Sequence, residues 1–308
     1  MYQFPRPLHK GATIGVIAPS SAAHRKQAQE GLAYLENRGY RLKTAPNLTR
    51  RKHYLAGNDK LRLHWLEHFI LDPEIDAIIC IRGGYGLLRI IDKIDYNRFT
   101  DMPPKLIVGY SDITALQMAL LAKLGWVGYT GPMVASDMSG QFDPYSEEWL
   151  WKVITNHPYP LNLQNPTGDE MVVYRPGNAE GPLVGGCLSL ITPLLGTEYM
   201  PDLKGAVLVV EDIGEKTYHL DKQLHILRLH GVFEEISALI LGHFVNCFPK
   251  NSKRSFTLPE FLDDVIGDYN FPVISNFAYG HIRKRLTLPL GARVRVETDP
   301  VKIEVFNI

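Results

Sequence analysis

The chain has few cysteines and no excess of charge of either sign. Its 308 residues include 3 cysteines, at positions 80, 187 and 247, and this odd, widely spaced set suits neither a disulfide framework nor a Cys-x-x-Cys metal pair. The 33 Lys and Arg residues balance 33 Asp and Glu residues, so the formal net charge is zero. Without a basic excess, we expect no nucleic-acid partner.

Long apolar runs are also missing. No stretch approaches the roughly 20 apolar residues of a membrane span, and the N-terminal MYQFPRPLHKGATIGVIAPSS lacks the uninterrupted apolar core of a signal peptide. We therefore expect a cytoplasmic protein with no membrane partner. The H-E-x-x-H and G-x-G-x-x-G spacings are absent as well, which disfavours a metal hydrolase and a Rossmann dehydrogenase. We predict no metal and no cofactor.

The first half of the chain alternates short apolar runs with helical patterns. Strands are expected at Ala12–Ala18, Tyr40–Ala45, Asp76–Ile81, Lys105–Gly109 and Trp126–Tyr129, with helices at His24–Arg38, Asp59–Leu71, Leu87–Ile94 and from Asp112. This order predicts a parallel α/β sheet of the flavodoxin or Rossmann-like kind. Ligands of such sheets bind at the carboxyl ends of the strands.

The length of the chain suits two domains. We predict an N-terminal α/β domain at 1–160, a linker at 161–180 where prolines and polar residues gather, and a C-terminal α/β domain at 181–308. The sequence ARVRVETDPVKIEVFNI at the end alternates on both sides of Thr298-Asp299-Pro300, which predicts a β-hairpin.

The stretch KLIVGYSDITALQMALLAKLG at 105–125 turns from a strand directly into a helix, with Ser111 at the turn. Such a turn lifts a side chain to the sheet edge and leaves free backbone N–H groups, so Ser111 could be a nucleophile beside an oxyanion site. Serine is also a preferred N-cap residue, which is the alternative interpretation. The G-x-S-x-G elbow is not matched, because Ile113 stands at the second glycine position.

Two further polar residues follow apolar strands or turns in the second half. Glu211 ends GAVLVVE, and His281 follows Gly280. A serine hydroxyl needs a neutral imidazole to accept its proton and a carboxylate to hold the imidazole. Ser111, Glu211 and His281 would supply these groups, although a surface acid and a hydrogen-bonded surface histidine remain the alternatives for the last two.

The chain resembles the LD-carboxypeptidase family, which includes muramoyltetrapeptide carboxypeptidases and microcin C immunity peptidases. The matching segments are VIAPSS (16–21), IRGGYG (81–86), VGYSDITAL (108–116), GPLVGGCLSLI (181–191), VLVVEDIGEKTYHLDKQL (207–224) and YGHIRKRLTLPLG (279–291). They span nearly the whole chain in the family's order.

The resemblance implies a Ser-Glu-His triad at Ser111, Glu211 and His281. It also implies an oxyanion hole formed by the backbone amides of Asp112 and Gly84, with Gly83 as the alternative to Gly84.

Arg82 and Gly83 are candidate substrate-binding residues, and Arg82 could meet a substrate carboxylate through its planar guanidinium or form a structural ion pair. Cys187 stands where the family is expected to have asparagine.

The activity implied by the resemblance is removal of the terminal D-alanine from a murein tetrapeptide in peptidoglycan recycling, by a cytoplasmic homodimer. One alternative is hydrolysis of an aminoacyl-nucleotide conjugate, as in the immunity branch. Another is a non-catalytic α/β protein that binds a small ligand at the sheet edge.

Overall fold

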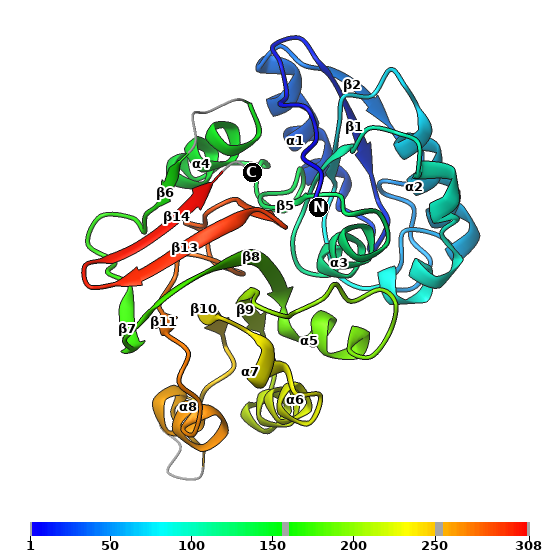
Figure 1. Ribbon diagram of the computed structural model, residues 1–308. Helices are drawn as coiled ribbons and strands as arrows, with labels where there is room; N and C mark the ends of the chain where they lie inside the picture. Colours follow the sequence, from blue (N-terminus) through cyan, green and yellow to red (C-terminus); the bar gives the residue numbers. More distant parts are fainter. Residues whose placement is uncertain (1, 156–159, 250–254, 307–308) are drawn as a thin grey trace. The chain divides into compact units, whose positions relative to one another are not determined.

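The computed structural model describes residues 2–155, 160–249 and 255–306. The chain divides into two compact units (Figure 1). The first unit comprises Met1–His157 and Leu286–Gly291, and the second comprises Pro158–Arg285 and Ala292–Ile308. A short segment late in the chain thus returns to the first unit, which the sequence did not predict.

The first unit contains a 6-stranded sheet in the order β12-β5-β4-β3-β1-β2. Its strands are β1 (Thr13–Ile17), β2 (Arg41–Thr44), β3 (Ala77–Cys80), β4 (Leu106–Val108), β5 (Gly128–Thr130) and β12 (Leu288–Leu290). The first five run parallel, as the alternating pattern predicted, and β12 pairs antiparallel with β5. The predicted parallel sheet is therefore confirmed.

The helices of the first unit are α1 (Arg25–Asn37), α2 (Asp59–Leu71), α3 (Ile113–Leu124) and α4 (Pro144–Ile154) among the described residues. The helix predicted at Leu87–Ile94 is absent. Two 3-10 segments, Leu87–Arg89 and Ile91–Lys93, take its place. Between them Ile90 has φ −130°, outside the helical range, so the backbone cannot continue as one helix.

The second unit contains an 8-stranded sheet in the order β6-β14-β13-β8-β9-β10-β11-β7. Its strands are β6 (Leu161–Leu163), β7 (Val172–Arg175), β8 (Asn178–Cys187), β9 (Val207–Ile213), β10 (Ala238–Val245), β11 (Val273–Ser275), β13 (Arg293–Thr298) and β14 (Val301–Phe306). The central β8, β9, β10 and β11 are parallel. β13 and β14 form the predicted hairpin, with Val294 and Val296 facing the core.

Four helices of the second unit lie in the described part of the chain: α5 (Leu188–Ile191), α6 (Thr217–Leu229), α7 (Val232–Glu235) and α8 (Leu258–Ile266). The segment 161–180, expected as a linker, instead supplies two edge strands to this sheet. β6 pairs with β14 and β7 pairs with β11. Leu161 and Leu163 are buried there, so their apolar side chains outweigh the surrounding prolines and polar residues.

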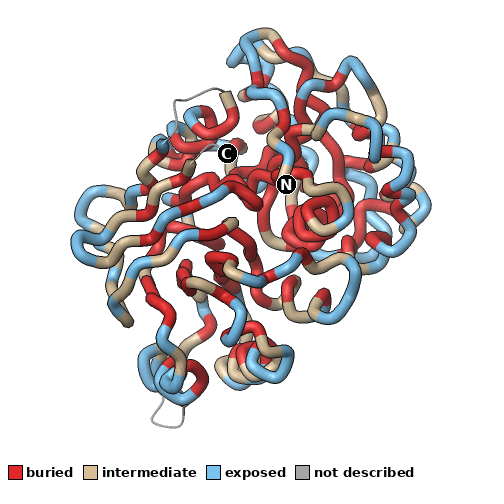
Figure 2. The backbone as a smooth tube through the Cα atoms, viewed as in Figure 1, coloured by how far each residue is buried: buried red, intermediate tan, exposed pale blue. Residues whose placement is uncertain are grey.

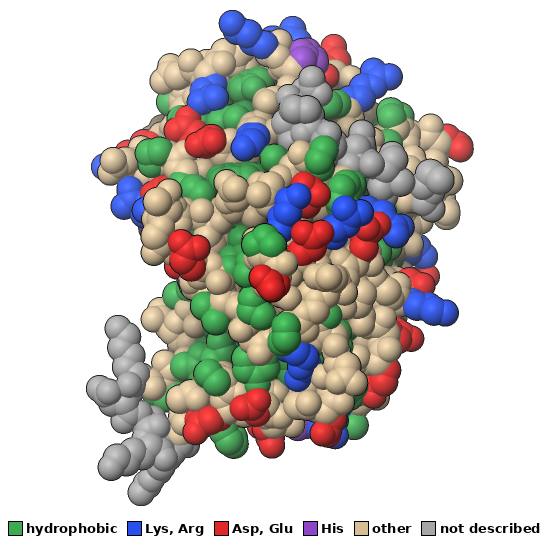
Figure 3. All heavy atoms as spheres, turned by 60° about the vertical axis from the view of Figure 1, so that its left-hand side comes forward, with side chains coloured by type: hydrophobic (Ala, Val, Ile, Leu, Met, Phe, Trp, Pro, Cys, Tyr) green, Lys and Arg blue, Asp and Glu red, His purple; other side chains and the backbone are tan. Residues whose placement is uncertain are grey.

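Each unit has its own core (Figure 2). In the first sheet β1, β3 and β4 are buried throughout, and in the second sheet the buried parts are 207–212 of β9 and 238–242 of β10. On the face shown in Figure 3, basic and acidic side chains lie interspersed, as the balanced composition suggests. Within the described ranges, no helix combines the length and the apolar character needed to cross a bilayer.

Candidate active site

Ser111 lies at the turn from β4 to α3 and has a strained backbone. Its φ is +64°, in the left-handed region that L-residues other than glycine rarely adopt. Asp112 is the N-cap residue of α3, so Ser111 stands one position before the cap. The structure thus assigns the N-cap position to Asp112, and the Ser111 carbonyl accepts the Thr114 N–H at 2.9 Å. A strained serine between a buried strand and a helix has the geometry of a nucleophile elbow.

The glycine loop at 82–86 lies against this serine. A Cβ atom placed on Gly83 would lie 2.8 Å from the Ser111 Cβ and 3.0 Å from its Oγ, so only glycine fits so close to the hydroxyl. Gly84 has φ +114°, and a Cβ there would overlap the Ser21 hydroxyl. The Nε of Arg82 is buried and has no hydrogen-bond partner among the residues that the structure describes. The loop thus brings Gly83 against Ser111, and Gly84 next to it against Ser21.

The side chain of Asp112 connects the serine turn to the far end of the glycine loop. It is fully buried, and its Oδ2 accepts the Leu87 N–H at 3.0 Å. Burial raises the pKa of Asp112, whereas the bonds from the Leu87 and Gly86 amides favour the ionised form. Asp112 therefore fixes the loop through its side chain and leaves its own backbone amide at the start of α3 beside Ser111.

Ser21 and a pair of tyrosines complete the surroundings of the loop, and sequence reasoning did not assign them. The Ser21 Oγ donates to the Tyr54 carbonyl at 2.5 Å and accepts the Tyr85 N–H at 3.3 Å. The rings of Tyr54 and Tyr85 meet edge to face at 5.5 Å, and both side chains are largely exposed. They offer an aromatic surface next to the loop. In the sequence, the signals for this aromatic surface are limited to Tyr85 in IRGGYG and Ser21 in VIAPSS.

In the second unit, Glu211 and His281 form a close pair. The Oε2 of Glu211 lies 2.8 Å from the His281 Nδ1 and accepts the His281 backbone N–H at 3.2 Å. The Glu211 side chain is 0% exposed and that of His281 is 13% exposed. An anchored Nδ1 leaves Nε2 as the ring nitrogen that can exchange a proton with another group.

Two glycines allow this pair to form. A Cβ on Gly280, whose φ is +117°, would lie 2.7 Å from the Glu211 Oε2. A Cβ on Gly242 in β10 would lie 3.2 Å from the Glu211 Cβ and closer still to the Tyr279 carbonyl. Glu211 sits in β9, where its neighbours Val209 and Val210 are buried. The strand holds the carboxylate, and the Tyr279–His281 segment closes over it.

Cys187 pairs with Glu211 across the β8–β9 register and is buried. Burial raises the pKa of its thiol well above the usual range, and the neighbouring carboxylates of Glu211 and Asp212 act in the same direction. A neutral thiol of this kind is a weak nucleophile. Asp212 accepts the Ser189 N–H at 2.8 Å, so this carboxylate holds the start of α5.

The sequence-predicted residues thus gather in two places. Ser111, Asp112, Gly83, Gly84 and Arg82 lie together in the first unit, and Glu211 and His281 lie together in the second. Within the described ranges, no group of three or more His, Cys, Asp or Glu side chains is arranged to hold a metal ion. A hydroxyl, an imidazole and a carboxylate are groups that nucleophilic and acid–base catalysis uses.

Comparison with known proteins identifies the family. The LD-carboxypeptidase N-terminal domain matches residues 14–131, and the LD-carboxypeptidase C-terminal domain matches residues 180–296. The chain belongs to the LD-carboxypeptidase family. The probable murein peptide carboxypeptidase of Bacillus subtilis (strain 168) is 34% identical over 96% of this chain and 91% of its own.

Two further members of the family differ in what their names describe. The structure of muramoyltetrapeptide carboxypeptidase from Oxalobacter formigenes is 28% identical, covers 96% of this chain and 98% of its own, and has a TM-score of 0.82. The microcin C7 self-immunity protein MccF of Escherichia coli is 28% identical over 97% of this chain and 94% of its own. The MccF complex with aspartyl sulfamoyl adenosine has a TM-score of 0.87 and covers 99% of this chain and 98% of its own. The α/β fold and the peptidase class of this LD-carboxypeptidase follow from these relationships.

Proposed function

We propose that this protein is a serine LD-carboxypeptidase that removes the terminal D-alanine from murein tetrapeptides, with Ser111, Glu211 and His281 as its triad. The observation that carries the proposal is the buried Glu211–His281 pair, with 2.8 Å between Oε2 and Nδ1. The left-handed backbone of Ser111 supports the nucleophile assignment. The triad requires the two units to bring Ser111 to the His281 ring.

In the first half of the reaction, the Ser111 Oγ attacks the carbonyl carbon that precedes D-alanine. The His281 Nε2 accepts the hydroxyl proton, and Glu211 stabilises the resulting imidazolium through Nδ1–H. The carbonyl oxygen becomes an oxyanion, which the Asp112 and Gly84 amides stabilise. The tetrahedral intermediate collapses, the C–N bond breaks, and His281 returns its proton to the amine of D-alanine.

The second half removes the acyl group from Ser111. A water molecule gives its proton to His281 and attacks the ester carbonyl, and the same amides stabilise the second oxyanion. Collapse of that intermediate returns the proton to the Ser111 Oγ and releases the shortened peptide. The reaction consumes one water molecule and needs no cofactor.

The proposed substrate ends in a carboxylate, and Arg82 is the proposed partner of that group. A guanidinium is suited to carboxylate recognition, and its buried Nε without a partner among the described residues supports this role over a structural ion pair. Trp149 and Trp151 are buried, which excludes them as an exposed platform for a nucleotide base. Peptidoglycan recycling, a cytoplasmic location and a homodimer complete the proposal, and all three rest on family membership.

A second candidate is hydrolysis of an aminoacyl-nucleotide conjugate, because the MccF relative forms a complex with aspartyl sulfamoyl adenosine. The exposed Tyr54–Tyr85 pair beside the glycine loop favours it, since aromatic side chains stack on bases with roughly 1–3 kcal/mol per base. The same exposed rings can also contact a peptide.

The test is product analysis with a synthetic murein tetrapeptide that ends in D-alanine, compared with an aminoacyl-sulfamoyl adenosine. We expect D-alanine and a tripeptide, with a higher kcat/KM on the peptide. A preference of tenfold or more for the nucleotide would replace the murein assignment and leave the triad in place. In parallel, Ser111→Ala should fold and lower kcat by roughly 10⁴- to 10⁶-fold. If Ser111→Ala keeps a tenth of the activity, Ser111 is not the nucleophile.

A further inference from the structure

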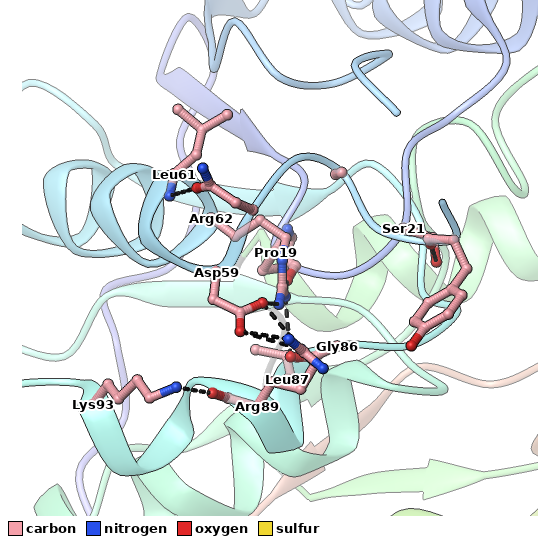
Figure 4. A network of polar contacts seen from close by, with 12 residues as sticks. Pro19, Ser21, Asp59, Leu61, Arg62, Gly86, Leu87, Arg89 and Lys93 are labelled. Atoms are coloured by element: carbon pink, nitrogen blue, oxygen red, sulfur yellow. Dashed lines mark hydrogen bonds and ion pairs between the residues drawn. The ribbon is translucent and has the colours of Figure 1, made fainter. Parts of the chain in front are cut away.

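Arg62 is a buried arginine whose guanidinium joins two loops of the first unit. Its side chain is 0% exposed. Nη1 donates to the Pro19 carbonyl and, at 3.0 Å, to the Gly86 carbonyl. Nη2 donates to the Asp59 Oδ1 at 2.7 Å, which supplies the counter-charge (Figure 4). A charged group is costly to bury, so its use on two backbone carbonyls indicates a positional role.

The Gly86 carbonyl belongs to the glycine loop, and the Pro19 carbonyl belongs to the neighbouring turn that contacts this loop. Gly86 ends the loop, and a Cβ there would lie 2.6 Å from the Arg62 Nη1, so the backbone packs directly on the guanidinium. Pro19 begins the turn that carries Ser21. The Ser21 N–H donates to the Gly83 carbonyl at 3.4 Å, and its Oγ accepts the Tyr85 N–H. Gly84 lies between these fixed points.

We propose that Arg62 is a positioning residue of the hydrolysis, because it holds the Gly84 amide where an oxyanion forms beside Ser111. The inference rests on the proposed function above. The loop approaches the nucleophile so closely that a shift of a few tenths of an ångström changes the donor geometry at the oxyanion. Ser21 holds the middle of the loop, and Asp112 and Arg62 hold its end through the Leu87 N–H and the Gly86 carbonyl.

This role predicts a loss of transition-state stabilisation with little loss of substrate binding. Removal of an oxyanion donor costs roughly 10²- to 10³-fold in kcat, and misplacing one should cost less. Arg62→Lys cannot donate to two carbonyls and Asp59 in one plane, so kcat should fall about tenfold. Arg62→Gln should lower kcat about 30-fold, which is below the cost of removing the donor. In both variants KM should stay within threefold.

The matched control is Arg89, the other arginine on Asp59. Its Nη2 lies 2.8 Å from the Asp59 Oδ2, but its side chain is 42% exposed, and the guanidinium donates to Asp59 rather than to a loop carbonyl (Figure 4). Arg89→Gln should keep kcat within threefold. Asp59→Asn leaves Arg62 without its counter-charge and should lower kcat by about three- to tenfold. This variant therefore perturbs the Arg62–Gly86 contact without changing Arg62 itself.

The experiment measures kcat, KM, the Ki of a peptide boronate that forms a tetrahedral adduct with Ser111, and the Ki of the tripeptide product. A transition-state analogue reports on the oxyanion hole, whereas the product does not. The boronate Ki should rise in proportion to the fall in kcat/KM, with the product Ki unchanged. A merely structural loss would reduce the fraction of active enzyme and leave both Ki values unchanged.

Three outcomes would overturn the inference. One is a folded Arg62→Gln enzyme with kcat and boronate Ki within threefold of the parent. Another is a lower kcat with an unchanged boronate Ki. If both Arg62 variants fail to fold, equal kcat values for Asp59→Asn and Arg89→Gln would overturn it. A Ser111→Ala control separates the proposed function from the role of Arg62. An active Ser111→Ala enzyme would refute the proposed function. An inactive Ser111→Ala enzyme together with a normal Arg62→Gln enzyme would refute only the role of Arg62.

Discussion

Replacement of Glu211 by glutamine should remove the charge of the proposed triad and keep its shape. The carboxylate is fully buried, and Oε2 faces both the Nδ1 and the backbone N–H of His281. A glutamine can place its oxygen there, but its amide group then occupies the position of Oε1, which has no partner in the described part of the chain. The reverse orientation sets two donors against each other at the backbone N–H. The first orientation is therefore expected.

The magnitude follows from what the charge does during the reaction. With the oxygen facing His281 the ring keeps its orientation, so the loss comes from the imidazolium that is no longer stabilised. Loss of the triad carboxylate costs about 10³- to 10⁴-fold in kcat, which is roughly 4 to 5.5 kcal/mol in the barrier. The unpaired amide adds roughly 1–3 kcal/mol of destabilisation to the fold. KM should change little.

The assay is a double-mutant cycle on tetrapeptide hydrolysis with Glu211→Gln, His281→Ala and the double variant. If Glu211 acts through His281, the double variant should be no slower than His281→Ala alone, because the residues work as a unit. Thermal unfolding of each protein checks the fold. Two results would refute the reasoning: a folded Glu211→Gln enzyme with more than a tenth of the parent activity, or effects that multiply in the double variant.

Three further predictions concern the first unit. Ser111→Gly relieves the left-handed backbone, so its free energy of unfolding should exceed that of the equally inactive Ser111→Ala by about 0.5–1 kcal/mol, and it should melt at a higher temperature; equal melting temperatures would argue against strain. Hydrogen bonds from Arg89 and, to a smaller extent, from Arg62 lower the pKa of Asp59 to about 2. The ionised carboxylate therefore stabilises the fold above about pH 4, and this stabilisation is lost as the pH falls through 2. Asp59→Asn should therefore cost at most about 2 kcal/mol in urea unfolding at pH 7 and little at pH 2, and a pH-independent difference would contradict the assignment. A fragment of residues 1–160 lacks β12 and exposes the edge of β5, so it should aggregate in light scattering unless residues 286–291 are fused to it; a monodisperse fragment would show that β12 is dispensable.

The turn at Ser111 could be predicted from the sequence because its signals are local. An apolar run with β-branched residues gave β4, helical spacing gave α3, and Gly125 ends that helix in the left-handed conformation, with φ +69°. The alternation on both sides of Thr298-Asp299-Pro300 likewise gave the β13–β14 hairpin. In these places neighbouring residues carry the whole pattern.

Contacts between distant residues could not be predicted in the same way. Arg62 shares the buried face of α2 with Leu66, Phe69 and Ile70, although arginine is usually found at the surface, and its partner Pro19 is 43 residues away. β12 has only three residues, and a short apolar run does not reveal which sheet it joins. The return of β12 to the first unit depends on pairing with β5, which no spacing rule within 286–291 encodes.

The missing second glycine of the elbow motif has a physical explanation in this structure. A Cβ on Gly109 would lie 2.9 Å from the Ile113 Cγ1, so the glycine at the strand end makes room for the buried isoleucine side chain. The motif G-x-S-x-G provides space with two glycines, whereas here one glycine and the packing of Ile113 produce a strained serine turn. Because Ile113 is anchored in the core, it also fixes the start of α3, whose first amides lie beside Ser111. The position of Ser111, the proposed nucleophile, is thus set by packing within the first unit, and its backbone angle supports that role where the glycine pattern does not.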